Sequence, residues 1–155
     1  MKIVLIEPDI PWNAGNIGRT CVATGTELVF VGKMGFSLSD KAIRRSGLDY
    51  WQFLKYAVFP DLYSFLCSLP ENPSLLFFST RGAATHWQAP YREDSCLIFG
   101  AETAGFPEWI YEKYADKLYR IPMCSDRVRS INLSTAAGIV LYEALRQVRP
   151  GGFPG

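Results

Sequence analysis

The chain has 155 residues, of which 48% are hydrophobic and 20% charged, the composition of a globular domain and not of a disordered protein. Its formal net charge of +1 excludes a uniformly basic protein that coats nucleic acid and an acidic, solvated tail. The near-zero sum still allows a local basic patch, because residues 57–116 are net acidic and residues 117–155 are net basic. The length predicts a single domain over residues 1–150, followed by a flexible tail at residues 151–155.

Cysteine spacing and the amino terminus bear on metal binding and compartment. The chain has four cysteines, none in a Cys-x-x-Cys pair: Cys21, Cys67, Cys96 and Cys124. Since His86 is the single histidine, the spacing of a zinc site is absent, and we predict no metal and free, mostly buried thiols. The apolar run Ile3–Ile6 is too short for a signal peptide or a membrane span. We therefore expect a cytoplasmic protein that does not associate with membranes.

Short apolar runs alternate with helical patterns along the chain. Strands are predicted at Lys2–Ile6, Glu27–Val31, Lys55–Phe59, Leu75–Ser79, Cys96–Phe99 and Leu118–Ile121. Helices are predicted at Asn16–Thr24, Leu62–Ser68, Pro107–Tyr114 and Leu133–Val148, with a short basic helix or loop at Lys41–Ser46. This alternation predicts an α/β domain with a mainly parallel sheet and helices on both faces.

Four loops rich in Gly, Asn, Ser and Arg directly follow predicted strands, at residues 7–16, 79–82, 100–105 and 122–132. In open α/β sheets, ligands bind beyond the carboxyl ends of the strands, so these loops are the candidate site. None of them holds a G-x-G-x-x-G or a G-x-x-x-x-G-K-[ST] sequence, which disfavours an ordinary dinucleotide enzyme or a P-loop ATPase. A nucleophilic triad is also hard to build, because His86 lacks a neighbouring Ser or Cys in a known frame.

Three blocks in these loops carry a family resemblance: Asn13–Arg19, Phe99–Pro107, and Ile121–Met123 with Arg129–Ser134. In this order they resemble the three motifs of the SPOUT superfamily of RNA methyltransferases. The nearest branch is the small one that methylates the ribose 2′-hydroxyl of the tRNA wobble nucleotide. The resemblance extends over nearly the whole chain, and the length leaves no room for the extra RNA-binding domain of the larger relatives.

The resemblance implies a fold and an activity. The family fold is an α/β domain whose C-terminal part forms a deep trefoil knot, and its members are homodimers with the site near the subunit interface. The implied activity is S-adenosylmethionine-dependent 2′-O-methylation of cytidine or uridine 34, in the anticodon region of tRNA. Two alternatives stay open: the same chemistry at another tRNA or rRNA position, or a non-catalytic RNA-binding module of this fold.

For the cofactor, the resemblance assigns S-adenosylmethionine contacts to Phe78, Gly100, Ile121, Met123 and Ser130. The apolar members would frame the adenine, and the glycine would let the cofactor approach the backbone. Each also has a plain structural alternative: core packing for the apolar residues, a turn for the glycine, and a helix N-cap for the serine.

The catalytic candidates are Arg19, Asn13 and Asn132, which lie in the first and third motifs. Arg19 matches the essential arginine of the family, and because arginine is a poor base we predict that it binds a phosphate and favours the developing oxyanion. Asn132 is assigned to the RNA site, although it is also a good N-cap. Glu102, in the second motif, is expected to anchor the loop geometry.

Arg81, Arg129 and His86 are the RNA-binding candidates, the arginines through backbone phosphates and the histidine through an unpaired base. The segment from Met123 to Ser130 is one residue longer than in the family pattern, and Gly18 is smaller than the apolar residue expected there. The last predicted helix carries an apolar stripe that either packs on its own sheet or forms a dimer contact.

Overall fold

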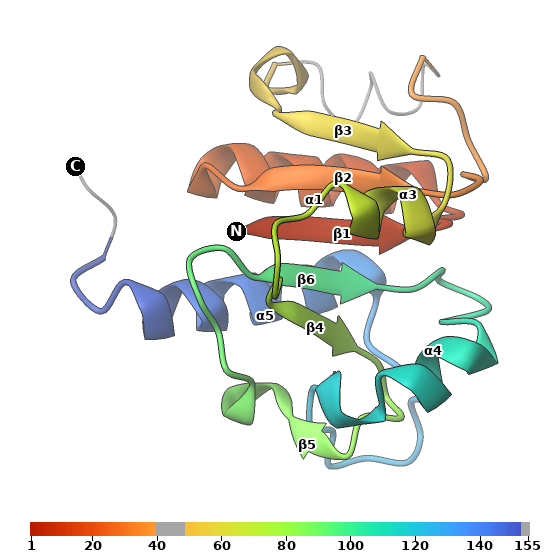
Figure 1. The fold of residues 1–155 in the computed structure, drawn as a ribbon, viewed down its shortest axis with the longest axis vertical. Coiled ribbons are helices and arrows are strands. Elements are labelled where there is room, and N and C mark those ends of the chain that lie inside the picture. The colour runs from red at the N-terminus through yellow and green to blue at the C-terminus, as the bar shows by residue number, and fades with distance from the viewer. Residues whose placement is uncertain (40–48, 153–155) are drawn as a thin grey trace.

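A computed structural model describes residues 1–39 and 49–152 of the chain (Figure 1). The basic element predicted at Lys41–Ser46 lies outside these residues. Within them, seven parallel strands form one sheet in the order β3-β2-β1-β6-β4-β7-β5. The strands are β1 (Lys2–Ile6), β2 (Glu27–Val31), β3 (Tyr56–Phe59), β4 (Leu75–Phe78), β5 (Ala84–Thr85), β6 (Cys96–Phe99) and β7 (Leu118–Arg120). The α-helices are α1 (Pro11–Thr24), α3 (Leu62–Cys67), α4 (Glu108–Lys113) and α5 (Leu133–Val148), and the 3-10 helices are η1 (Trp51–Phe53), η2 (His86–Gln88) and η3 (Ala115–Lys117).

The predicted elements that fall within the described residues are confirmed, with one marked shift and four short elements omitted. Helix α1 begins at Pro11, five residues before the predicted start, because proline is favoured in the first turn, where its missing N–H costs nothing. The two-residue strand β5 and the three 3-10 helices had not been predicted, since segments this short carry no hydrophobic period.

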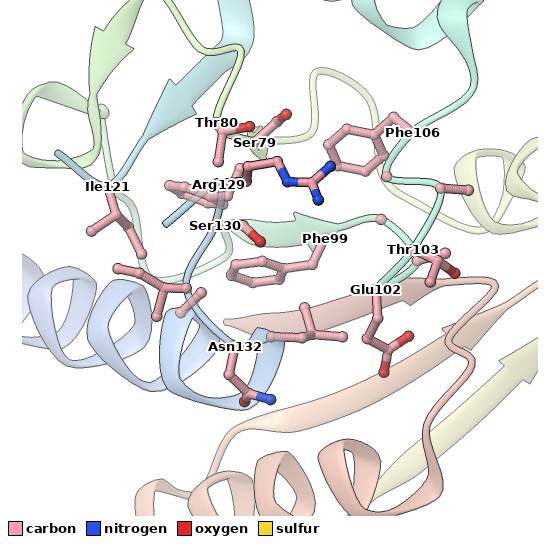
Figure 2. Close-up of a pocket in the computed structure, with 18 of the residues that line it drawn as sticks. Ser79, Thr80, Phe99, Glu102, Thr103, Phe106, Ile121, Arg129, Ser130 and Asn132 are labelled. Carbon is pink, nitrogen blue, oxygen red and sulfur yellow. The ribbon is translucent and has the colours of Figure 1, made fainter. Parts of the chain in front are cut away.

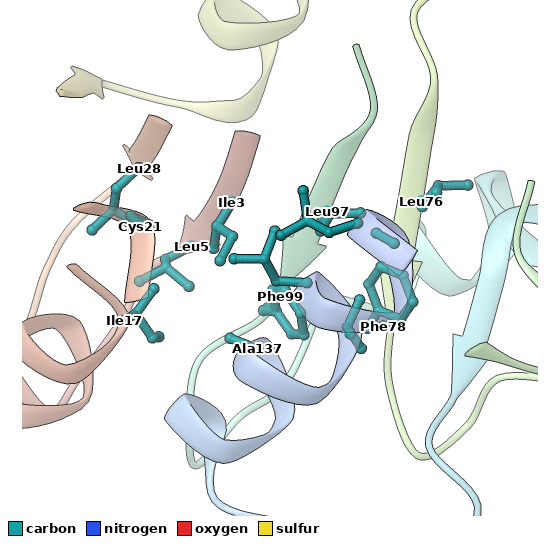
Figure 3. Packing of buried hydrophobic residues seen from close by; sticks show 14 of the residues in the cluster. Ile3, Leu5, Ile17, Cys21, Leu28, Leu76, Phe78, Leu97, Phe99 and Ala137 are labelled. Atoms are coloured by element: carbon teal, nitrogen blue, oxygen red, sulfur yellow. The ribbon is translucent and has the colours of Figure 1, made fainter. Parts of the chain in front are cut away.

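Helices cover both faces of the sheet, so the predicted layer arrangement is confirmed (Figure 1). Successive residues of β1 point to opposite faces: Ile3 and Leu5 pack with α1 and α5, while Val4 and Ile6 pack with α3 and α4. The first cluster is drawn in Figure 3. Burial on both faces explains why the strands are continuous apolar runs.

Helix α5 buries most of its predicted apolar stripe against its own sheet. The buried members are Ala137, Val140, Leu141, Ala144 and Leu145. On the opposite side of the helix, Ile139 and Tyr142 remain exposed. The packing interpretation is therefore confirmed for the stripe, and the exposed pair is a separate apolar surface.

The strand order brings the candidate loops together. The chain lays down β1, β2 and β3 towards one edge, then places β6 between β1 and β4, and β7 between β4 and β5. Because every pair is parallel, the segments that follow β1, β4, β6 and β7 leave the sheet along the same edge. These are the loops that the sequence singled out.

Close packing of two large side chains leaves little room for a side chain at Gly18 on α1. A Cβ on Gly18 would lie 3.1 Å from Cζ3 of Trp51 and 3.2 Å from Cδ2 of Leu54. The departure of Gly18 from the family pattern is thus matched by a large indole that fills the space from η1.

Candidate active site

A pocket of about 390 Å³ opens at the carboxyl edge of the sheet (Figure 2). It is lined by the segments that follow β4, β6 and β7 and by the first turn of α5. All five residues predicted to hold the cofactor line this pocket: Phe78, Gly100, Ile121, Met123 and Ser130. Arg129 and Asn132 line it as well, and Figure 2 shows the Arg129 side chain directed into it. Asn13, Arg19, Arg81 and His86 lie outside the lining.

The polar and apolar parts of the lining come from different elements. Phe78 ends β4 and stacks on Phe99 of β6, with ring centroids 5.3 Å apart, so one wall is a rigid aromatic pair. Ile121 and Met123, which follow β7, also line the pocket and are more open to solvent than this pair. An apolar wall with a few convergent polar groups is the usual form of a small-molecule site.

Gly100 is required by the loop in which it lies. A Cβ at this position would come within 2.5 Å of the carbonyl carbon and oxygen of Gly105. The backbones of Ala101 and Gly105 exchange two hydrogen bonds, of 3.1 and 2.9 Å, which close the loop tightly. The turn role of Gly100 is therefore established by its contacts, and it lines the pocket in addition.

A chain of hydrogen bonds joins the three motif loops. The Glu102 carboxylate accepts from the Asn13 side-chain amide at 3.0 Å, and the Asn13 oxygen accepts from the Asn132 amide at 3.0 Å. Asn13 is buried, with 3% of its surface exposed, so its amide orientation is fixed by these two partners. The expectation that Glu102 anchors the loop geometry agrees with these contacts.

Glu102 also stabilises the start of α1 from a distance of 92 residues in sequence. It accepts from the backbone N–H groups of Asp9, at 2.7 Å, and Ile10, at 3.2 Å. Helix α1 has neither a side-chain cap at Ile10 nor an acidic residue in its first turn. The carboxylate therefore supplies the negative group that a helix N-terminus favours.

Asn132 is the N-cap of α5, as one of its two predicted roles required. Its side-chain oxygen accepts from the backbone N–H groups of Ser134, at 2.9 Å, and Thr135, at 3.3 Å. The N-cap alternative for Ser130 is wrong, because the helix begins after Asn132. With its oxygen used in capping, Asn132 presents only its amide N–H groups to neighbours.

Arg19 lies on the exposed side of α1, away from the pocket lining. Its guanidinium is 5.0 Å from the centroid of the Tyr50 ring, and the Tyr50 hydroxyl donates to the carbonyl of Gly15 at 2.5 Å. The aromatic ring thus holds the charge near α1 through a cation–π contact. The single chain does not bring Arg19 together with the cofactor candidates.

Arg81 sits at the rim of the pocket in a compact cluster. Its guanidinium makes two hydrogen bonds to the Glu108 carboxylate, of 2.8 and 2.7 Å, and lies 3.6 Å from the centroid of the Tyr111 ring. The hydrogen bond from Arg81 holds the pKa of Glu108 below its usual range. More than half of each charged side chain is exposed, so this ion pair contributes little to stability.

The third RNA-binding candidate, His86, begins the 3-10 helix η2, next to Trp87. This side chain is buried, with 3% exposed, and its Nδ1 atom has no hydrogen-bond partner among the described residues. Burial lowers the pKa of the imidazole, which disfavours its charged form. The neighbouring Trp87 is 59% exposed and is therefore the accessible aromatic of this segment.

Ser79, Thr80 and Tyr111 also line the pocket. Ser79 and Thr80 belong to the predicted candidate loop at residues 79–82, although they were assigned no individual role. Tyr111 lies in α4, where no motif marks it. Across residues 1–39 and 49–152, no group of three His, Cys, Asp or Glu side chains could hold a metal ion. No helix in the same ranges has the length and apolar character needed to cross a membrane.

Comparison with known proteins places the chain in a family. The profile of the SpoU rRNA Methylase family matches residues 1–142. The chain is 44% identical to the tRNA (cytidine(34)-2′-O)-methyltransferase of Escherichia coli, over all of this chain and 96% of that protein. It is 42% identical to the protein of the same name from Yersinia pestis, again over all of this chain and 96% of the relative.

Solved structures that are similar to this chain point to the same family as the sequence matches. One that is described as giving structural insights into the 2-OH methylation of C/U34 on tRNA is 40% identical, with a TM-score of 0.90 over 94% of each chain. The SpoU methyltransferase AviRb of Streptomyces viridochromogenes, solved in complex with AdoMet, is 25% identical, with a TM-score of 0.83 over 98% of this chain and 61% of that one. The chain belongs to the SpoU methylase family, as the three sequence blocks indicated.

Proposed function

We propose that this protein transfers a methyl group from S-adenosylmethionine to the ribose 2′-hydroxyl of nucleotide 34, a cytidine or uridine, in tRNA. The observation that carries the proposal is the 44% identity, over the entire chain, to a relative named for that reaction. The pocket and its hydrogen-bonded motif loops supply the chemical support. The closeness to the tRNA enzymes favours tRNA over rRNA as substrate, because an rRNA methyltransferase from Sinorhizobium meliloti is only 26% identical.

The pocket fits the proposed cofactor. Its volume of about 390 Å³ lies in the range of sites for ligands of this size. Phe78 and Ile121 offer apolar surface to an adenine, and the backbone around Gly100 and the Ser130 hydroxyl offer polar partners. When bound, S-adenosylmethionine supplies an activated methyl group on its sulfonium.

Positioning is the main task left to the protein's own residues, since the donor is already activated. Asn132 lines the pocket, and its position is set by Asn13, which in turn is held by Glu102. We assign one N–H of Asn132 to a ribose oxygen of the substrate. Arg19 binds the adjacent phosphate and favours the oxyanion that forms as the hydroxyl loses its proton.

A homodimer would complete this site. Trp12 on α1 is 61% exposed, and Ile139 and Tyr142 on α5 are 38% and 53% exposed. Helices α1 and α5 pack on one another, so these side chains belong to one layer of the molecule. Because Arg19 lies outside the pocket lining, pairing through this layer is the route by which it would reach a site near the interface.

We also propose a knotted chain path, a cytoplasmic location and a surface that binds RNA. The placement of β6 and β7 inside the sheet supports a trefoil knot in the C-terminal part. A tRNA substrate and free thiols support a cytoplasmic location. Arg81 and Arg129 are proposed to bind phosphates and His86 an unpaired base, with the exposed Trp87 beside it offering a stacking surface.

Two measurements test this function. Calorimetry with S-adenosylmethionine should show binding. If the protein does not bind it, either with or without tRNA, the protein is a non-catalytic RNA-binding module. Mapping of methylated riboses in tRNA from a deletion strain should show loss at position 34. Loss at another tRNA position or in rRNA would instead place the same chemistry elsewhere.

Variants then test the assigned roles. Arg19→Lys should reduce kcat strongly, because an ammonium cannot make the paired contacts of a guanidinium. The affinity for tRNA should fall with salt with a logarithmic slope of about −2, as about three phosphate contacts to single-stranded RNA would give. A much steeper slope would indicate a long basic track in place of Arg19, Arg81 and Arg129.

A further inference from the structure

Tyr111 joins two loops of the pocket that are far apart in sequence. Its hydroxyl shares a hydrogen bond of 3.1 Å with the Ser79 hydroxyl, which follows β4. The same oxygen accepts from the backbone N–H of Phe106, at 3.4 Å, which ends the loop after β6. Ser79 also accepts from the backbone N–H of Arg81, at 3.3 Å, so the tie continues into the segment that carries the rim arginine.

Packing holds the Tyr111 side chain in place. Its ring meets Phe106 edge-on, with centroids 5.8 Å apart. Gly105 has a φ of 66°, and a Cβ there would lie 3.2 Å from the Tyr111 hydroxyl. The hydroxyl therefore lies directly beside the turn that closes the loop after β6, where a side chain at position 105 would crowd it.

The aromatic face of Tyr111 has a second contact. The Arg81 guanidinium lies 3.6 Å from the ring centroid, and Glu108 holds it there through two hydrogen bonds. Tyr111 and Glu108 are three residues apart on α4, a spacing that places them on the same side of a helix. Helix α4 thus supplies both the platform and the counter-charge for Arg81.

We propose that Tyr111 is a positioning residue with two separable tasks in the methyl transfer. Its hydroxyl sets the spacing of the two loops that grip S-adenosylmethionine, and its ring presents Arg81 to the RNA at the pocket rim. The inference rests on the proposed function, because it names cofactor and RNA as the two ligands. A purely structural tyrosine would affect stability without separating these two ligands.

Two substitutions divide the tasks. Tyr111→Phe removes only the hydroxyl, and Tyr111→Leu removes the hydroxyl and the aromatic face. For Tyr111→Phe we expect the KM and the calorimetric Kd for S-adenosylmethionine to rise about three- to ten-fold, because the bond with Ser79 and the longer one from the Phe106 N–H are both lost. Its KM for tRNA and its kcat at saturating cofactor should stay within two-fold. Tyr111→Leu should in addition raise the KM for tRNA about two- to five-fold, as the loss of a cation–π contact predicts.

Matched control variants distinguish loss of the positioning role of Tyr111 from general destabilisation of the fold. Tyr63→Phe removes an exposed hydroxyl on α3 and should behave as wild type. Ser79→Ala removes the bond between Ser79 and Tyr111 from the other side, so it should raise the cofactor Kd similarly. The double variant with Tyr111→Phe should show clearly less than the sum of the two effects, because both single variants lose that bond. Urea unfolding of each variant shows whether it is folded at the assay temperature. If Tyr111→Leu is unfolded, Arg81→Gln tests the rim contact in its place, with the same expected rise in the KM for tRNA and no change in the cofactor Kd.

Failure of the proposed function and failure of the role of Tyr111 give different results. If wild type fails to bind S-adenosylmethionine, the proposed function is wrong, and the assignment of Tyr111 falls with it. If wild type binds but Tyr111→Phe has an unchanged cofactor Kd, the function stands and the positioning role is wrong. An equal rise of both KM values in Tyr111→Phe would also overturn it, because the two tasks would not be separable.

Discussion

Replacing Glu102 with alanine removes one carboxylate that serves both the fold and the site. Three N–H donors lose their acceptor: those of Asp9, Ile10 and the Asn13 side chain. The Asn13 amide is buried, so it cannot exchange this bond for water, whereas the donor on Asp9 is at an exposed position. The start of α1 also loses the negative charge near its N-terminus.

The expected cost follows from these three losses. A buried donor left unsatisfied costs about 1–3 kcal/mol, and the charge at the helix N-terminus contributes about 0.3–1 kcal/mol. The two backbone groups recover part of their loss from water. The free energy of unfolding should therefore fall by about 3 kcal/mol, which in a domain of this size lowers Tm by about 6–12 °C.

Urea unfolding, followed by tryptophan fluorescence and by far-ultraviolet circular dichroism, measures this change. Glu112→Ala removes an exposed carboxylate from α4 and is the matched control. Asn13→Ala and the double variant complete a cycle, in which the two losses should be clearly less than additive because they share one bond. A Glu102→Ala midpoint equal to that of wild type would refute the reasoning, since an isolated buried amide could not then be costly.

Three further predictions concern charge, backbone and thiols. The hydrogen bond from Arg146, reinforced by Gln147, lowers the pKa of Glu143 from 4.5 to about 2. Because the folded-state pKa is the lower one, this stabilisation is complete above pH 4.5 and is lost as the pH falls towards 2, so the stability difference between wild type and Glu143→Gln should shrink between pH 7 and pH 3. Gly100→Ala should destabilise the fold by about 2 kcal/mol in urea unfolding, with Gly151→Ala unchanged, because only the first Cβ meets backbone. A thiol reagent should modify two of the four cysteines in the native protein, Cys67 and Cys124, because the other two are buried and burial raises the pKa of Cys21 to about 12 and of Cys96 to about 11; four fast thiols would contradict this burial.

The sheet and its ligand edge could be predicted because they depend on local pattern. A run such as Cys96–Phe99, apolar at every position, is recognisable as a strand buried on both faces. The five cofactor candidates line one pocket because each directly follows or ends a strand, or lies just before the last helix. The strand order could not be predicted, since nothing local in β6 or β7 says that each lies between strands formed earlier in the chain.

Individual side chains were predicted less well, because their surroundings come from distant segments. The thiols of Cys67 and Cys124 are exposed, against the expectation of mostly buried cysteines. His86 has the residue type and motif position of an RNA contact, yet the packing around β7 and α5 buries it. Tyr111 lies at the pocket rim through contacts made 32 and 5 residues away, without any motif of its own.

The hydrogen-bonded chain from Glu102 through Asn13 to Asn132 explains why three separated motifs work as one unit. Its two side-chain bonds span 89 and 119 residues, so each joins segments that only the complete fold brings together. One end caps the region before α1, and the other end caps α5. Because the same groups terminate both helices and line or support the pocket, the site takes its final geometry only when both helices are docked. Binding of a ligand that requires this geometry should therefore stabilise the whole fold, and not the pocket loops alone.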